Sequence, residues 1–159
     1  MQSILENNGR KLFNSGAYAV LFYLINDSQT YMPKYGDVTF KKGFYVYSGS
    51  AKKNLIHRVT RHAKKDKKVK WHIDYFSVLE SVKTVKTFLF FDKNECEINF
   101  FFYTNGGRSI IKNFGSSDCK NGCLSHFLYF KKQPALKSIK EFGYHNGKLF
   151  ILQHNKQTS

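Results

Sequence analysis

The sequence is poor in acidic residues, cysteine and proline, and these shortages exclude several classes of protein. Of its 159 residues only 11 are aspartate or glutamate, against 26 lysines and arginines, which gives a net charge of +15. The three cysteines leave an odd thiol, which argues against a secreted disulfide scaffold. With two prolines and no internal repeat or low-complexity linker, the chain has the size and composition of one domain.

Long apolar runs are also missing. The longest, from Ala17 to Ile25, has about half the length that a transmembrane helix needs. The first ten residues lack a charged start followed by an apolar stretch, so they do not resemble a signal peptide. We therefore expect a soluble, intracellular protein of the cytoplasm that does not use the membrane.

The excess of positive charge is the strongest compositional signal. Like charges repel one another in a compact chain, so a surplus of this size usually serves to meet a polyanion. Aromatic residues make up 17% of the chain and hydrophobic residues 42%, enough for a largely aromatic core. We expect the partner to be DNA, with RNA as the alternative. A chain that is merely basic, or that rests on an anionic membrane, is the competing interpretation.

The pattern of apolar residues predicts a mixed α+β fold, with a small central antiparallel or mixed sheet of three to four strands flanked by helices. The expected strands are residues 16–25, 36–40, 43–49, 81–91, 125–131 (an edge or closing strand) and 148–152. A turn is expected at 26–28. The expected helices are one that runs from Asn54 to the lysine-rich segment 64–68, and others at 71–79, 95–103 and 136–142.

The first helix has a clear apolar side. Leu55, Val59 and Ala63 repeat every four residues and form its expected core face. The expected opposite side carries Arg58, Arg61, His62 and Lys65. We expect a domain over residues 12–131 and an extension of unknown role over 132–159.

Three short motifs follow one another in the first half of the chain. The first strand opens with Gly16-Ala17-Tyr18, the third closes with Tyr47-Ser48-Gly49, and the next helix carries Asn54-Leu55-x-x-Arg58-x-x-x-His62. This arrangement resembles the GIY-YIG nuclease superfamily. Further blocks resemble its DUF123 branch, which is sometimes fused to a DNA-repair glycosylase. These blocks are Arg61-His62, Trp71-His72-Ile73-Asp74-Tyr75, Cys96-Glu97, Phe114-Gly115-Ser116-Ser117-Asp118-Cys119 and Ser125-His126-Phe127. The resemblance covers about residues 16–130.

The resemblance implies a metal-dependent endonuclease that hydrolyses phosphodiester bonds in DNA, selects DNA by structure and acts in repair or recombination. It implies Tyr18 and Tyr47 as the tyrosine pair, Arg58 as the phosphate clamp, and Glu97 as the ligand of one Mg²⁺ or Mn²⁺ ion, with no small-molecule cofactor. Glu95 is the alternative ligand. The expected catalytic residues are Tyr18, Tyr47, Arg58, His62 and His72. The expected nucleic-acid-binding residues are Gly49, Ser50, Arg61, Lys64, Lys65, Lys67 and Lys68.

Plainer interpretations remain open for these residues. The tyrosines suit strand packing, His72 suits a buried and hydrogen-bonded position, and the lysines suit a solvated loop. The whole domain could also be a catalytically silent module that binds DNA or RNA. Asp118, with Ser116 and Ser117, is expected to cap a turn or to organise the edge of a cleft.

Cysteine and histidine residues near position 120 offer a third possibility. Cys119, Cys123 and His126 have a spacing that suits zinc, and Cys96 could supply a fourth ligand. A zinc-stabilised interaction protein is therefore a further alternative, and free thiols are the plainer one.

Overall fold

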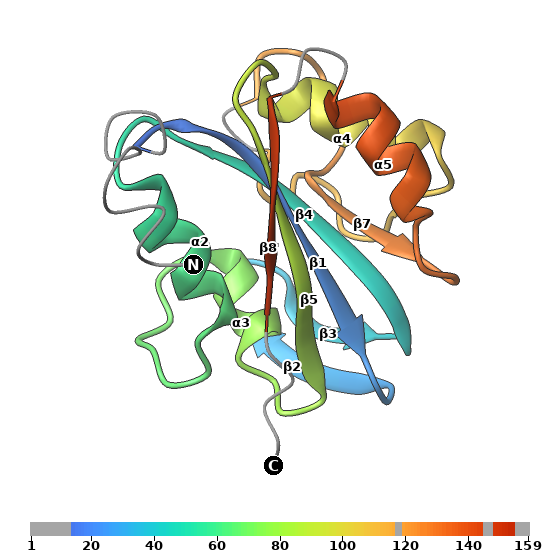
Figure 1. The fold of residues 1–159 in the computed structure, drawn as a ribbon. Helices are drawn as coiled ribbons and strands as arrows, with labels where there is room; N and C mark the ends of the chain where they lie inside the picture. Colours follow the sequence, from blue (N-terminus) through green and yellow to red (C-terminus); the bar gives the residue numbers. More distant parts are fainter. Residues whose placement is uncertain (1–13, 117–118, 145–147, 155–159) are drawn as a thin grey trace.

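The computed structural model describes residues 14–116, 119–144 and 148–154. Within these ranges the chain forms two antiparallel sheets and four helices (Figure 1). The strands are β1 (Gly16–Leu24), β2 (Ser28–Met32), β3 (Gly36–Phe40), β4 (Gly43–Ala51), β5 (Val82–Phe90), β6 (Arg108–Ser109), β7 (Phe127–Phe130) and β8 (Leu149–Gln153). The helices are α2 (Leu55–Ala63), α3 (His72–Ser77), α4 (Glu95–Thr104) and α5 (Leu136–Gly143).

The main sheet has six strands in the order β6-β7-β4-β1-β5-β8. Strand β1 is central and pairs with β4 on one side and β5 on the other, both antiparallel. Its sequence is almost entirely apolar, and nearly all of it is buried, because helices cover both faces of the sheet. Strands β2 and β3 form a separate two-stranded sheet.

Each face of the main sheet has its own core. Figure 1 shows α2, α3 and the β2–β3 sheet on one side and α4 and α5 on the other. The first core contains Tyr18, Val20 and Phe22 of β1 together with Leu55, Val59, Ile73 and Phe76 of the helices. The second contains Ala17, Ala19 and Leu21 of β1 together with Ile98, Phe102 and Ile139 of the helices. Alternate residues of β1 thus point to opposite faces, as the pleat of a strand requires.

The α+β class is confirmed, and so is the antiparallel pairing of the strand at 16–25 with the strand at 43–49. The helices expected at 71–79, 95–103 and 136–142 correspond to α3, α4 and α5, and the strand at 81–91 to β5. The prediction of three to four strands was wrong, because the main sheet has six. The strand expected as an edge or closing strand, β7, lies between β4 and the two-residue β6.

The C-terminal segment completes the main sheet. Strand β8 pairs with β5 along Lys86–Phe90, and α5 packs in the second core. The part of the expected extension that the structure describes is therefore continuous with the sheet and its core. Residue 12, where the domain was expected to begin, and Ser117 and Asp118 lie outside the described residues.

One further strand differs from expectation. The turn predicted at 26–28 leads directly into β2. The sequence did not indicate this strand, because few of its residues are apolar and they alternate between exposed and partly buried positions. None of the helices in the described part of the chain is long and apolar enough to cross a membrane.

Candidate functional site

Two tyrosines and a histidine from three different elements meet on the face of the sheet that α2 covers. The hydroxyl of Tyr18 on β1 lies 2.8 Å from Nε2 of His62 on α2, and the two atoms share a hydrogen bond. The ring of Tyr47 on β4 lies 5.5 Å from the His62 ring and 6.5 Å from the Tyr18 ring, between centroids. We call these three residues the tyrosine–histidine cluster.

The strand register explains why the two tyrosines come together. Tyr18 faces Gly49 across the β1–β4 pair, two residues beyond Tyr47 on the same face of β4. A Cβ atom on Gly49 would lie 2.6 Å from the Tyr18 hydroxyl. The space left by the absent side chain is thus filled by Tyr18, so Gly49 serves the packing of the cluster rather than direct approach by a substrate.

The cluster is uncharged near neutral pH. Burial, with the Tyr47 charge adding to it, raises the pKa of Tyr18 well above 10. Burial also raises the pKa of Tyr47 to about 12, although the positive charge of Arg58 opposes this. The same burial, reinforced by nearby lysine and arginine charges, lowers the pKa of His62 to about 3, so its imidazole is neutral. His62 therefore cannot attract phosphate as a cation.

His62 was expected on the solvent side of its helix, and this was wrong. The side chain is 1% exposed and faces the core with Leu55 and Val59. Positions 55, 59 and 62 lie on one side of a helix with 3.6 residues per turn, so His62 belongs to the apolar stripe. Its Nδ1 atom has no hydrogen-bond partner among the described residues.

Arg58 lies at the edge of the cluster. It is half-buried, and its Nη1 donates a hydrogen bond of 2.6 Å to the carbonyl of Ser50. Its guanidinium also lies 5.0 Å from the ring of Trp71, at a distance typical of a cation–π contact. Among the described residues these contacts of Arg58 are with neutral groups, so its charge remains available to an anion.

Arg61, expected to bind nucleic acid, is instead part of an internal ion pair. Its two terminal nitrogens donate to both carboxylate oxygens of Asp74, at 2.9 and 2.8 Å, and its guanidinium stacks on Trp71. The Asp74 carboxylate also accepts from the backbone N–H groups of Lys70 and Trp71. This network fixes α3 against α2 and supports Trp71 beneath Arg58.

The four lysines expected to bind nucleic acid fall into two groups. The Lys65 ammonium donates to three backbone carbonyls, and the Lys67 ammonium donates to Arg61 O and the Ser77 hydroxyl and lies 3.4 Å from Asp74. Both amines point inward, and burial lowers the pKa of Lys65 to about 8. Lys64 and Lys68 are exposed. Only the second pair has ammonium groups that face solvent.

His72, expected to be catalytic, makes no hydrogen bond or ring contact with the tyrosine–histidine cluster in the described part of the chain. Its ring packs against those of Tyr35 and Phe114, with centroids 5.4 and 6.1 Å away. Burial and the charge of Lys34 lower its pKa. Its recorded ring contacts are therefore packing contacts.

The structure separates the two candidate metal ligands of α4. Glu97 is exposed, and its Oε1 accepts from the Asn94 side chain at 2.8 Å while the Glu97 N–H donates to Asn94 in return, which forms a capping box. Its position therefore carries no burial cost that a metal would need to offset. Of these two carboxylates, Glu95 is the one whose charge contributes to the raised pKa of both Tyr18 and Tyr47.

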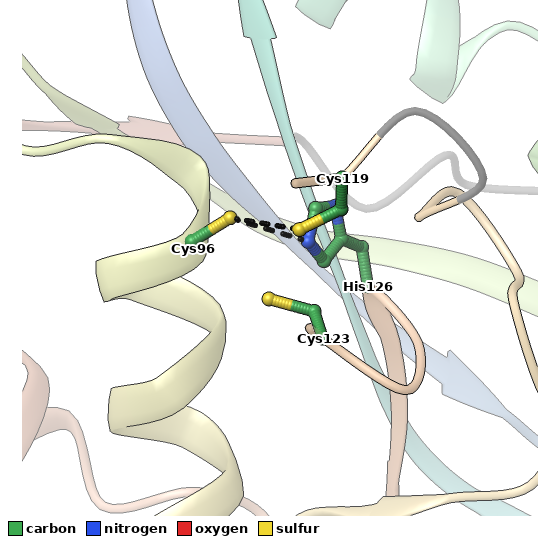
Figure 2. A group of neighbouring side chains, drawn as sticks. All are labelled: Cys96, Cys119, Cys123 and His126. Atoms are coloured by element: carbon green, nitrogen blue, oxygen red, sulfur yellow. Dashed lines mark hydrogen bonds between the residues drawn. The ribbon is translucent and has the colours of Figure 1, made fainter. Parts of the chain in front are cut away.

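The three cysteines and His126 converge at the start of α4. Figure 2 shows the thiols of Cys96, Cys119 and Cys123 directed toward a common space beside the His126 ring. One ligand atom from each residue lies within 4.8 Å of every other, so the set can hold a metal ion. The sequence spacing indicated three of these residues, and the fold brings Cys96 to them.

Two residues that support the surroundings of Arg58, namely Asp74 and Trp71, were not assigned a role from the sequence. Asp74 organises Arg61 and Lys67, and Trp71 holds two guanidinium groups; both stand in the block Trp71-His72-Ile73-Asp74-Tyr75 that carries the family resemblance. The available signal in the sequence was an aspartate among so many basic residues, because an aspartate that becomes buried must be paired.

Comparison with known proteins identifies the family. Searches of the curated proteins and of the solved structures find no match to this chain. The family model described as "Domain of unknown function DUF123" matches residues 17–146. This range contains the four helices and the strands from β1 to β7, except for the first residue of β1, and ends before β8. The chain therefore belongs to the DUF123 family.

Proposed function

We propose that this protein is a divalent-metal-dependent endonuclease of the GIY-YIG type that hydrolyses phosphodiester bonds in DNA and selects its substrate by structure, as an enzyme of repair or recombination would. The observation that carries the proposal is the convergence of Tyr18, Tyr47 and His62 beside Arg58. These residues come from β1, β4 and α2, so the fold and not local sequence assembles them.

Arg58 supplies the positive charge for the phosphate. Its guanidinium is held by the Ser50 carbonyl and the Trp71 ring, which leaves its charge without a carboxylate partner among the described residues. A guanidinium fixed in this way needs little reorganisation when it meets the negative charge that develops on a phosphate in the transition state.

Tyr47 is positioned to orient the attacking water. It is half-buried, and its hydroxyl has no hydrogen-bond partner in the described part of the chain. With a pKa of about 12 the hydroxyl is neutral at physiological pH, so it acts by hydrogen bonding unless cations lower its pKa. Tyr18 and His62 behind it hold the tyrosine ring in place through their hydrogen-bonded pair.

Glu95 is the residue that suits the divalent ion. Its carboxylate is about one-third exposed, and one of its oxygens lies 3.9 Å from His126 Nδ1, so most of its coordination capacity is free. One carboxylate and several waters form a suitable environment for Mg²⁺ or Mn²⁺. The bound ion supplies charge that stabilises the leaving oxygen.

The exposed lysines flank α2 at both ends. Lys52 and Lys53 precede the helix, and Lys64, Lys68 and Lys70 follow it. A DNA backbone that crosses α2 near Arg58 would meet positive charge on both sides. Such contacts set position on the backbone and carry no sequence information, which agrees with selection by DNA structure.

The direct test is a panel of labelled single-stranded, duplex, flap and junction DNAs, with matched RNAs, incubated with Mg²⁺, Mn²⁺ or a chelator. We expect metal-dependent cleavage of at least one branched DNA. Glu95→Gln should abolish that cleavage, whereas the matched control Glu97→Gln should keep it. Cleavage that persists in the chelator, or that is lost only in Glu97→Gln, would contradict the metal assignment.

One observation favours a second candidate, a DNA- or RNA-binding module without catalysis. The carboxylate that the family resemblance assigned to the metal, Glu97, is exposed and caps α4 through Asn94. Salt-sensitive binding to the same panel, with no cleavage under any metal condition, would support this module and refute the nuclease.

A further inference from the structure

Three cysteines and a histidine, here called the cysteine–histidine cluster, lie beside the candidate site and have no part in the chemistry proposed there. Cys96 is the second residue of α4, and Cys119, Cys123 and His126 belong to the segment between β6 and β7. These elements are far apart in sequence, yet one ligand atom from each lies within 4.8 Å of all the others (Figure 2).

The spacing of these atoms fits a tetrahedral metal and not a disulfide. Zinc–sulfur bonds of about 2.3 Å place two tetrahedral sulfurs about 3.8 Å apart, and a zinc-bound nitrogen slightly closer to each sulfur. The Sγ atoms of Cys96 and Cys119 lie 3.3 Å apart, and Cys96 Sγ lies 3.8 Å from His126 Nε2. A disulfide requires about 2.05 Å. All three cysteines are free thiols.

The surroundings of the cluster favour a bound cation. His126 is 1% exposed, its Nε2 faces the thiols, and its Nδ1 has no hydrogen-bond partner among the described residues. The Glu95 carboxylate lies 3.9 Å from that Nδ1, beyond hydrogen-bond distance, and places an acidic group beside the cluster. The backbone N–H of Asn121 donates to Cys119 Sγ, and Cys96 stands in the first turn of α4.

We propose that Cys96, Cys119, Cys123 and His126 bind one zinc ion in a closed, structural site. Three thiolates and an imidazole select zinc over Mg²⁺ or Mn²⁺, which prefer oxygen. Four protein ligands complete a tetrahedron and leave no open position for a substrate or an activated water. This ion is therefore distinct from the divalent ion proposed at Glu95.

The zinc site would fasten the segment before β7 to both the sheet and α4. The backbone carbonyl of His126 accepts a hydrogen bond from Ser48 of β4, and its N–H donates to the carbonyl of Phe114. Next to Phe114, Gly115 passes so close to Tyr47 that a Cβ there would lie 2.9 Å from the tyrosine ring. Loss of zinc would thus loosen the wall beside Tyr47. This consequence for cleavage rests on the proposed function, whereas the zinc site itself does not.

The first experiment measures metal in the full-length protein, purified without a metal-affinity step and analysed by inductively coupled plasma mass spectrometry. We expect about one zinc per chain, and replacement by Co²⁺ should give the visible absorption of a tetrahedral, thiolate-rich site. Zinc removal should lower the melting temperature by more than about 5 °C, with recovery on adding zinc but not magnesium.

Two results would overturn the proposal. One is a fully reduced protein that carries no zinc and whose melting temperature does not respond to added zinc. The other is a Cys96–Cys119 disulfide in protein prepared without reductant, together with the absence of metal. Both measurements use the wild-type chain, so they decide the question even where a ligand variant fails to fold.

Variants identify the ligands. Cys96→Ser and His126→Gln should each weaken zinc binding by more than about 100-fold, since loss of an outer partner alone costs about 10- to 100-fold. The matched control His57→Gln removes an exposed histidine and should keep full zinc content. Zinc loss in the control to the same degree would refute the assignment. A chain that holds zinc but cuts no nucleic acid would refute the nuclease and leave the zinc site intact.

Discussion

Replacing Asp74 with asparagine tests the network that holds α3 against α2 and positions Trp71, against which the Arg58 guanidinium packs. The Asp74 side chain is 0% exposed and faces Arg61 and Lys67. Burial by itself raises the pKa of Asp74, but hydrogen bonds from Arg61 and from the Trp71 and Lys70 N–H groups, with the charge of Lys67, outweigh it. The net effect lowers the pKa from 3.8 to about 2.

The size of the effect follows from this pKa. A depressed carboxyl pKa means that the folded state favours the ionised form, at about 1.4 kcal/mol per pKa unit. The change from 3.8 to about 2 therefore corresponds to about 2 kcal/mol. Asparagine has the shape of the protonated acid, so Asp74→Asn should lower the free energy of unfolding by about 2 kcal/mol near neutral pH.

The pH dependence gives the sharper assay. The contribution of Asp74 is fully present above about pH 5, shrinks as the pH falls below the unfolded-state pKa of 3.8, and is lost near the folded-state pKa of about 2. Urea denaturation of both proteins across this range should show curves that converge in acid. A difference that stays constant from neutral pH to about pH 2, or that is below about 0.5 kcal/mol throughout, would refute the reasoning.

The remaining predictions concern catalysis and binding. Tyr47→Phe should lower cleavage by at least about 100-fold and leave DNA binding within about twofold, as measured by single-turnover kinetics and binding titration; full activity would remove the tyrosine from the mechanism. Because the pKa of His62 is about 3, the rate should show no inflection between pH 5 and 8 from this residue, and an inflection lost in His62→Gln would contradict its neutral state. Neutralising Lys64 and Lys68 together should reduce the salt slope of binding by about 1 to 2, and an unchanged slope would exclude them from the interface. Lys65→Ala should instead lower the free energy of unfolding by about 1 to 3 kcal/mol, since three backbone carbonyls lose their hydrogen bond from Lys65; an unchanged urea midpoint would contradict this.

Much of the fold could be predicted because the strong signals are local. The apolar run of β1 and the helical spacing of Leu55 and Val59 each express a periodicity that needs no distant partner. The number of strands could not be predicted in the same way. Strand β6 has two residues, and β8 joins the sheet only because β5 presents a free edge to the C-terminal segment.

The candidate site likewise combines residues that the sequence indicated with contacts that only the fold creates. The sequence by itself determined the residue types: the tyrosines of β1 and β4, the arginine of α2, and the cysteines with a histidine at metal-binding spacing. Tertiary structure decided which of them meet. Glu95 and Glu97 differ by two positions on a helix with 3.6 residues per turn, so they point to nearly opposite sides, and only packing decides which one faces the tyrosines. His62 became a buried neutral partner, and Cys96 joined three ligands from another segment, because long-range contacts between elements set burial and proximity.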